Sequence, residues 1–182
     1  MYTQPGILRR GIAQFVCLGI ITVLAFTTNG FAANTSPCAE NPESRQLDYW
    51  LGDWAIGAAG SSGNAHSKVS LTLDKCLVVE TWDGGKGHSG QNVFGYSADD
   101  KNWYGMFADN EGRVHVFTSG KVASGSAEFE GTSRGPNGET VLNRVKIVQL
   151  SPKKVEQSWE KSIDNGTTWN LVFRGEYSRS NP

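Results

Sequence analysis

The feature that most constrains this 182-residue chain is a succession of short β-type segments separated by turn residues. From Gly52 onward, segments rich in β-branched and aromatic residues recur at 71–73, 77–82, 92–96, 103–107, 114–117, 141–150, 155–159 and 169–177. Between them lie clusters of Asp, Asn and Gly that are typical of hairpin loops. Because the connections are too short for crossover helices, neighbouring strands should run antiparallel. The pattern predicts an all-β fold of about eight to ten strands, closed as a barrel or folded as a sandwich.

One segment ahead of the strands favours a short helix. Residues 42–51 combine good helix formers with Leu47, Trp50 and Leu51, which share one helical face. We expect this helix to cap one end of the sheet structure.

The first 32 residues have the pattern of a secretory signal peptide. Arg9 and Arg10 precede an apolar run from Ile12 to Phe26, and small residues precede a predicted cleavage after Ala32. The alternative is a retained membrane anchor, but the run is shorter than the roughly 20 apolar residues that span a bilayer. We therefore expect a secreted or periplasmic protein without a membrane span after cleavage. Its mature chain should comprise an N-terminal extension over 33–46 and one domain over 47–179.

The charge balance excludes some classes of partner. The formal net charge is −1, and neither sign is clustered, so neither nucleic acid nor an anionic membrane is expected as a partner. The sequence gives no indication of the oligomeric state.

Two cysteines, Cys38 and Cys76, remain once the leader is removed. In an oxidising compartment they should form one disulfide. The alternative is that Cys76 is a small buried residue and Cys38 a free thiol, although such a thiol near a secreted terminus would be reactive.

The string SIDNGTTW, from Ser162 to Trp169, fits the Asp-box pattern of sialidases. A hairpin explains each of its residues: Asp164 accepts hydrogen bonds from backbone N–H groups, Gly166 adopts a left-handed conformation, and Trp169 packs over the turn. Sialidase propellers repeat the box once per blade, whereas this chain has one copy and no repeat of blade length. We therefore expect a structural hairpin and no cleavage of glycosides.

Three segments resemble a family of secreted bacterial proteins of unknown function. The string LDYWLGDW over 47–54 is similar to the FDFWLGDW signature that opens this family, and 76–82 and 159–177 resemble its second and third motifs. The resemblance implies a single up-and-down, lipocalin-like β-barrel in which Gly52 and Trp54 begin the first strand and plug the barrel base. It implies no activity.

The sequence predicts neither a metal nor a cofactor. The three histidines, His66, His88 and His115, lie more than twenty residues apart, with no carboxylate or cysteine at a metal-ligand spacing. Haem-binding barrels of this general type carry a histidine ligand near the C-terminus, but no histidine follows His115 here.

A lumen site is the best candidate for ligand binding. Glu80 and Trp82 share one strand face with Cys76 and Val78, and Arg144 is the best available partner for a buried Glu80. The other residues that we assign to this lumen are Trp103, His115 and Trp159. Together they would form a cavity with apolar walls and a few polar anchors. The alternative is that the tryptophans fill a small barrel that has no room for a ligand.

These observations favour a secreted protein that binds a small apolar or aromatic ligand. One alternative is a structural envelope or surface domain with a filled barrel. A second is an enzyme that uses Glu80 as a general acid or base, its pKa raised by burial. The enzyme is less favoured because the sequence offers no second catalytic group at a fixed spacing.

Overall fold

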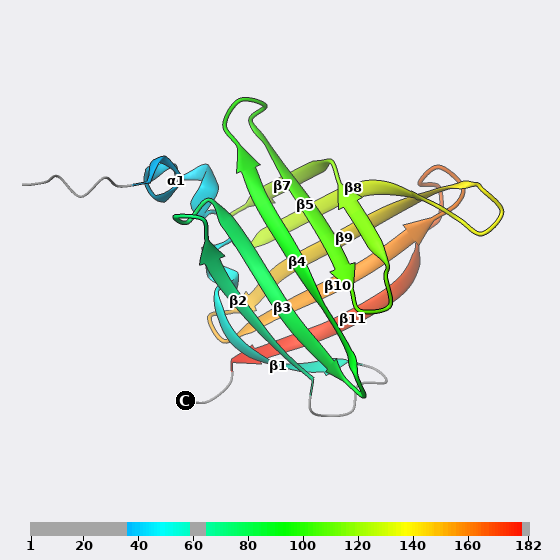
Figure 1. Cartoon of the computed structure of the whole chain (residues 1–182), viewed down its shortest axis with the longest axis horizontal. Coiled ribbons are helices and arrows are strands. Elements are labelled where there is room, and N and C mark those ends of the chain that lie inside the picture. The colour runs from blue at the N-terminus through cyan, green and yellow to red at the C-terminus, as the bar shows by residue number, and fades with distance from the viewer. Residues whose placement is uncertain (1–35, 59–64, 180–182) are drawn as a thin grey trace, which may run out of the picture. The chain divides into compact units, whose positions relative to one another are not determined.

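The computed structural model describes residues 36–58 and 65–179 (Figure 1). The predicted signal peptide, residues 1–32, lies outside the described residues. The elements are α1 (Pro37–Glu40), the 3-10 turns η1 (Glu43–Arg45) and η2 (Asp48–Trp50), β1 (Gly52–Ala58), β2 (His66–Thr72), β3 (Leu77–Gly85), β4 (His88–Ser97), β5 (Asn102–Asp109), β6 (Val114–Phe117), β7 (Ser119–Ala123), β8 (Ser126–Arg134), β9 (Thr140–Ser151), β10 (Lys154–Ser162) and β11 (Asn170–Arg179). None of the helices in the described part of the chain has the length and apolar character needed to cross a membrane.

The eleven strands form one antiparallel sheet that is nearly closed into a barrel, which confirms the predicted fold class. The order of strands in the sheet is β6-β5-β4-β3-β2-β1-β11-β10-β9-β8-β7. Strands that pair are therefore consecutive in the chain, except for β1 and β11, while the consecutive strands β6 and β7 lie at the two ends of the order. The prediction missed β7 and β8 because their sequences, SGKVA and SAEFEGTSR, contain mainly small and polar residues.

A single stretch of chain brings the two edges of this sheet together. β6 pairs with β5, and β7, which begins after Thr118, pairs with β8. At the junction the Thr118 N–H donates a hydrogen bond to the Glu130 carbonyl, 2.9 Å away. The segment 114–123 thus changes its pairing partner at Thr118, from β5 to β8. This change nearly closes the barrel, so that no strand edge of the sheet is left free along its whole length.

One end of the barrel, which we call the base, is plugged by residues 43–54. The segment predicted as one helix forms the two turns η1 and η2 instead, and the short helix lies earlier, at α1. In 3-10 geometry residues three apart share a face, and Leu47 and Trp50 are both fully buried against the strands. Trp50 lies 6.0 Å from Phe94 between ring centroids, and the Trp103 N–H donates to the Gln46 side chain.

Trp54 completes the base. Its indole is 1 % exposed, its N–H donates to the Trp50 carbonyl at 2.9 Å, and the Arg179 guanidinium stacks 4.1 Å from its ring centre. The same guanidinium donates to the Leu51 carbonyl and passes so close to Gly52 that a Cβ there would overlap it. Gly52 therefore leaves the space in which Arg179 covers Trp54.

The predicted disulfide joins Cys38 and Cys76, with a Cα–Cα distance of 4.9 Å. It ties α1 to the residue before β3 and closes a loop of 38 residues. The disulfide therefore attaches the N-terminal segment covalently to the base of the barrel, in addition to the packing contacts of this segment.

The string SIDNGTTW forms the β10–β11 connection. Asp164 accepts from the Thr168 N–H at 2.9 Å and from the Thr168 hydroxyl, and Gly166 has a φ of 85°. These hydrogen bonds from Thr168 are the main reason that the pKa of Asp164 falls to about 2. The Trp169 N–H donates to the Gly166 carbonyl, so the indole folds back over the turn.

We expect Trp54→Ala to lower the free energy of unfolding by about 3–5 kcal/mol, because it removes a large buried side chain at the base. Leu150→Ala is the control, since Leu150 is 52 % exposed and its truncation should change stability by no more than about 0.5 kcal/mol. Urea unfolding of both variants measures the effect. Equal, small losses for the two would show that the base does not depend on Trp54.

Replacing both disulfide cysteines, as Cys38→Ser with Cys76→Ser, should lower the free energy of unfolding by up to roughly 4 kcal/mol, the chain-entropy value for a loop of this length. Peptide mapping of the unreduced protein should recover Cys38 and Cys76 in one linked peptide. Recovery of both residues as free thiols would contradict the assigned bond.

Candidate functional site

The interior of the barrel is divided by a polar layer, which we define as Ser67, Glu80, Asn92, Gln157 and Tyr177. All five side chains are buried, with exposures between 0 and 6 %. Alternation along each strand sets the layer between two apolar regions: on β3, Val78 lies on the base side of Glu80 and Trp82 on the other. The base side is a packed core, and the other side contains a cavity.

Glu80 is the centre of the polar layer. Its two carboxyl oxygens accept hydrogen bonds from the Ser67 hydroxyl and the Asn92 amide, both at 2.7 Å. Complete burial raises the pKa of Glu80, and these hydrogen bonds oppose the rise without cancelling it. The group is therefore held in its uncharged form to higher pH than an ordinary glutamic acid.

Gln157 and Tyr177 complete the layer from the opposite strands. The Tyr177 hydroxyl donates to Gln157 Oε1, and both side chains lie close enough to Glu80 to act on its pKa. Burial, with the adjacent Glu80 carboxyl group, raises the pKa of Tyr177 well above its usual value. The layer thus places the hydrogen-bonded groups of β2, β3 and β4 beside the hydrogen-bonded pair of β10 and β11 inside the barrel.

A cavity of about 360 Å³ lies on the side of the polar layer away from the base. Its lining includes Asn92, Gln157 and Tyr177 from the layer, so these polar groups form its floor. The remaining lining residues are Ile56, Ala65, Trp82, Gly84, His88, Phe107, Arg113, His115, Val145, Trp159, Lys161, Val172 and Phe173. The side chains of His88 and Arg113 are 39 % and 51 % exposed, so the cavity reaches solvent at this end of the barrel, which we call the rim.

Aromatic rings make up the wall of the cavity. Trp82 stacks on Phe107 with an angle of 12° between ring planes, and Phe107 meets Trp159 edge to face at 5.0 Å. His115 lies 4.7 Å from Trp159, also edge to face. The rings come from β3, β5, β10 and β6, so they surround the cavity from several strands, and contacts of this kind hold each ring in a fixed orientation.

Two neighbours fix the tryptophans in place. Gly90 lies beneath Trp82, and a Cβ at this position would overlap the Ala108 carbonyl and come within 2.7 Å of the indole ring. The Trp159 N–H donates to Asn143 Oδ1 at 3.2 Å. Both indoles are therefore positioned by the barrel in the absence of a ligand.

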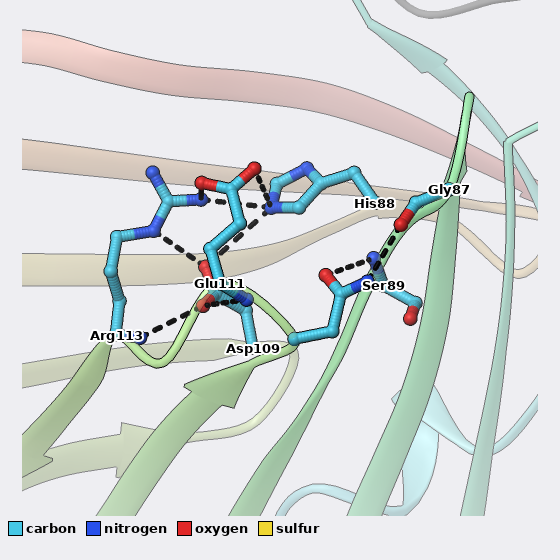
Figure 2. Close-up of polar contacts among 7 residues, drawn as sticks. Gly87, His88, Ser89, Asp109, Glu111 and Arg113 are labelled. Atoms are coloured by element: carbon cyan, nitrogen blue, oxygen red, sulfur yellow. Dashed lines mark hydrogen bonds and ion pairs between the residues drawn. The ribbon is translucent and has the colours of Figure 1, made fainter.

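An ion-paired cluster borders the cavity at the rim (Figure 2). Arg113 lies between two carboxylates, with Nε 2.6 Å from Asp109 and Nη2 2.8 Å from Glu111. The same Nη2 donates to His88 Nε2 at 2.9 Å. Burial acts to raise the pKa of Asp109, but hydrogen bonds from Arg113 and from the Glu111 backbone N–H outweigh it and lower the pKa to about 2.

His88, Asp109 and Glu111 are also of the types that bind metal ions, and their ligand atoms lie within 4.8 Å of one another. The guanidinium of Arg113 already contacts all three side chains and forms ion pairs with both carboxylates. We therefore interpret the cluster as a structural device that holds the β5–β6 turn over the β3–β4 hairpin and places Arg113 at the cavity.

His115 forms part of the cavity wall without a polar partner of its own. Its Nδ1 atom is buried and makes no hydrogen bond with the described residues. Burial lowers the pKa of His115, and the positive charges of Lys161 and Arg113 add to this effect while Asp109 opposes it. The ring is thus a largely uncharged aromatic surface at neutral pH.

The structure brings together only part of the predicted lumen site. Trp82, His115 and Trp159 line the cavity, and Glu80 lies behind its floor. Trp103 points inward but lies in the packed core at the base, 3 % exposed.

The predicted pairing of Arg144 with Glu80 is wrong. Arg144 lies on the outer face of β9, since the inward positions of this strand are Val141, Asn143 and Val145. It pairs with Glu160 at 2.8 Å and stacks on Trp169 at 3.8 Å. Glu80 is satisfied by uncharged donors instead.

Several cavity residues escaped the sequence analysis. Two of them, Gln157 and Lys161, share the period-two face of Trp159 on β10, so continuing the alternation from Trp159 would have identified them. Phe107 could have been found in the same way on β5. The contact between His88 and Arg113, by contrast, depends on how β4 meets the β5–β6 turn, and no local pattern encodes it.

A scan against models of protein families and a search of curated proteins both found no match for this sequence. The function must therefore be argued from the geometry of the cavity.

Glu80→Gln should become more stable relative to the wild type as pH rises. The unfolded chain releases the Glu80 proton near the ordinary pKa of 4.5, whereas the folded protein retains it to higher pH, so wild-type stability falls across this window. Glutamine cannot ionise, and Asn92 can turn its amide to accept from it. The difference in the free energy of unfolding should grow by up to about 1.4 kcal/mol per pH unit above this pKa. Urea unfolding at several pH values measures it, and a difference that is constant or shrinks with pH would contradict the burial of an uncharged acid.

Proposed function

We propose that this protein binds a small apolar or aromatic molecule in the cavity at the rim of its barrel. The observation that carries the proposal is a preformed space of about 360 Å³ with walls of aromatic rings and a polar floor. Small-molecule sites typically occupy roughly 300–1,000 Å³, with apolar walls and a few placed polar groups. The volume falls near the lower limit, which favours a small ligand.

The distribution of polar groups supports a defined binding orientation. The floor offers Asn92, Gln157 and Tyr177, whose side chains supply both donors and acceptors. The walls offer Trp82, Phe107 and Trp159, which bind flat apolar groups through stacking. A ligand would enter with its apolar body between the rings and any polar atom toward the floor or the rim.

The geometry favours binding over the two alternatives. A purely structural barrel would be expected to fill its interior, as this one does below the polar layer. For catalysis, Glu80 would have to reach a ligand, but its carboxyl group lies behind the floor and its oxygens accept from Ser67 and Asn92. We further propose a secreted or periplasmic location, which the disulfide supports, and membership of the secreted bacterial family that the motifs resemble.

The neutral fluorescent probe N-phenyl-1-naphthylamine tests the proposal. Wild-type protein should enhance its fluorescence saturably, with one site per chain. Trp82→Ala should weaken binding by about tenfold or more, because Trp82 is an aromatic anchor of the wall. Trp169→Ala is the matched control, since Trp169 stacks on Arg144 outside the cavity, and it should change the Kd by less than about twofold.

Thermal unfolding of both variants would establish that they are folded before binding is compared. The absence of saturable probe binding to the wild type would overturn the proposal. Equal losses for Trp82→Ala and Trp169→Ala would show that the probe binds somewhere other than the cavity.

A further inference from the structure

The charged groups that line the cavity are all basic. The lining contains two basic side chains other than histidine, Arg113 and Lys161, and no aspartate or glutamate among the described residues. Arg113 is ion-paired with Asp109 and Glu111 at the rim, so any attraction of the cavity for negative charge must come from Lys161. The two cations differ, however, in whether their charge is already neutralised.

Arg113 is not free to bind a ligand anion. Its guanidinium makes contacts of 2.6 Å and 2.8 Å with Asp109 and Glu111, so two carboxylates already share its charge. Recruiting it would break an ion-paired cluster that also holds His88.

Lys161 has no such partner. Lys161 occupies an inward-facing position of β10, and its cross-strand neighbours are Asn143 on β9 and Asn170 on β11. No ion pair joins it to a carboxylate of residues 36–58 or 65–179, and its ammonium instead lies 5.3 Å from the centre of the Trp159 ring. The adjacent Glu160 points outward and is occupied by Arg144 and Lys146.

Lys161 therefore presents a half-buried, unneutralised positive charge beside the aromatic wall. A cation in this position loses part of its hydration without gaining a counter-ion, so an anionic ligand group would bind more strongly here than at an exposed lysine. A lysine is a point charge with rotatable donors, which suits one compact anionic group, whereas dianionic phosphate is more often held by several cations.

We propose that the ligand of this cavity is an aromatic or otherwise apolar monocarboxylate, whose apolar body lies against Trp82, Phe107 and Trp159 and whose carboxylate pairs with Lys161 Nζ. This inference rests on the proposed binding function and adds the charge of the ligand to it. Because Lys161 is at the rim end of β10, beyond Trp159, the carboxylate is the end of the ligand nearer the solvent.

Three probes that share one naphthyl group separate charge from apolar fit: naphthalene-2-carboxylate, naphthalene-2-carboxamide and 2-naphthylmethylammonium. Isothermal titration at low salt should show the carboxylate binding about tenfold tighter than the amide, with the ammonium weakest. Lys161→Gln should remove the preference for the carboxylate, so that the carboxylate and the amide bind this variant about equally. Lys161→Arg should retain the preference for the carboxylate.

Lys154→Gln is the matched control. Lys154 is on the same strand, and its substitution removes the same charge, but it pairs with Glu176 at 2.6 Å outside the cavity. This variant should bind all three probes as the wild type does, which excludes a general effect of net charge.

The outcomes distinguish this inference from the function on which it rests. If none of the probes binds, both the proposed binding function and the inference about ligand charge are wrong. If the amide and the carboxylate bind equally, and Lys161→Gln changes neither, the cavity binds ligands but the assignment of charge is wrong. Tightest binding of the ammonium would also overturn it, and this comparison needs only the wild-type protein.

Discussion

The buried carboxyl group of Glu80 is the constraint on which the interior of this barrel depends. A carboxyl group that is fully enclosed must be surrounded by hydrogen-bonding groups. A buried polar atom without a hydrogen bond lowers the stability of the folded protein by about as much as several apolar contacts raise it. Ser67 and Asn92 meet this need directly, and Gln157 and Tyr177 satisfy each other beside it. Apolar side chains cannot replace one member without leaving the others unsatisfied, so the polar layer is fixed as a unit.

The polar layer separates two regions that serve different purposes. At the base, the plug of residues 43–54, the stack of Arg179 on Trp54 and the disulfide hold a dense core together. At the rim, rings that pack against one another leave a hollow that they do not fill. The side chains around an unfilled space make fewer dispersion contacts, which lowers the stability of the folded protein. The base can offset this loss of stability because its own packing is independent of the rim. Binding groups carried on paired strands are held more precisely than groups on loops.

The sequence predicts the fold well because strand alternation and turn chemistry are local properties. Strand alternation also identifies Trp82 and Trp159 as inward residues, but it does not give their position along the axis of the barrel. It therefore cannot separate Trp103 at the base from Trp159 at the rim. The error on Arg144 was avoidable: Val141, Val145 and Ile147 mark the odd positions of β9 as inward, which leaves Arg144 outside. The Arg113 cluster and the partners of Glu80 depend on the register between strands, which no single segment encodes.

The central claim, that the cavity binds a ligand between its aromatic walls, is tested most directly by the indole N–H resonances of the six tryptophans in ¹⁵N-labelled protein. On titration with naphthalene-2-carboxylate, the resonances of Trp82 and Trp159 should shift saturably, because these two indoles line the cavity. Those of Trp50 and Trp54 in the base, and of Trp169 outside the barrel, should stay in place. Saturable binding that shifts Trp169 or the base tryptophans and leaves Trp82 and Trp159 unchanged would contradict the account.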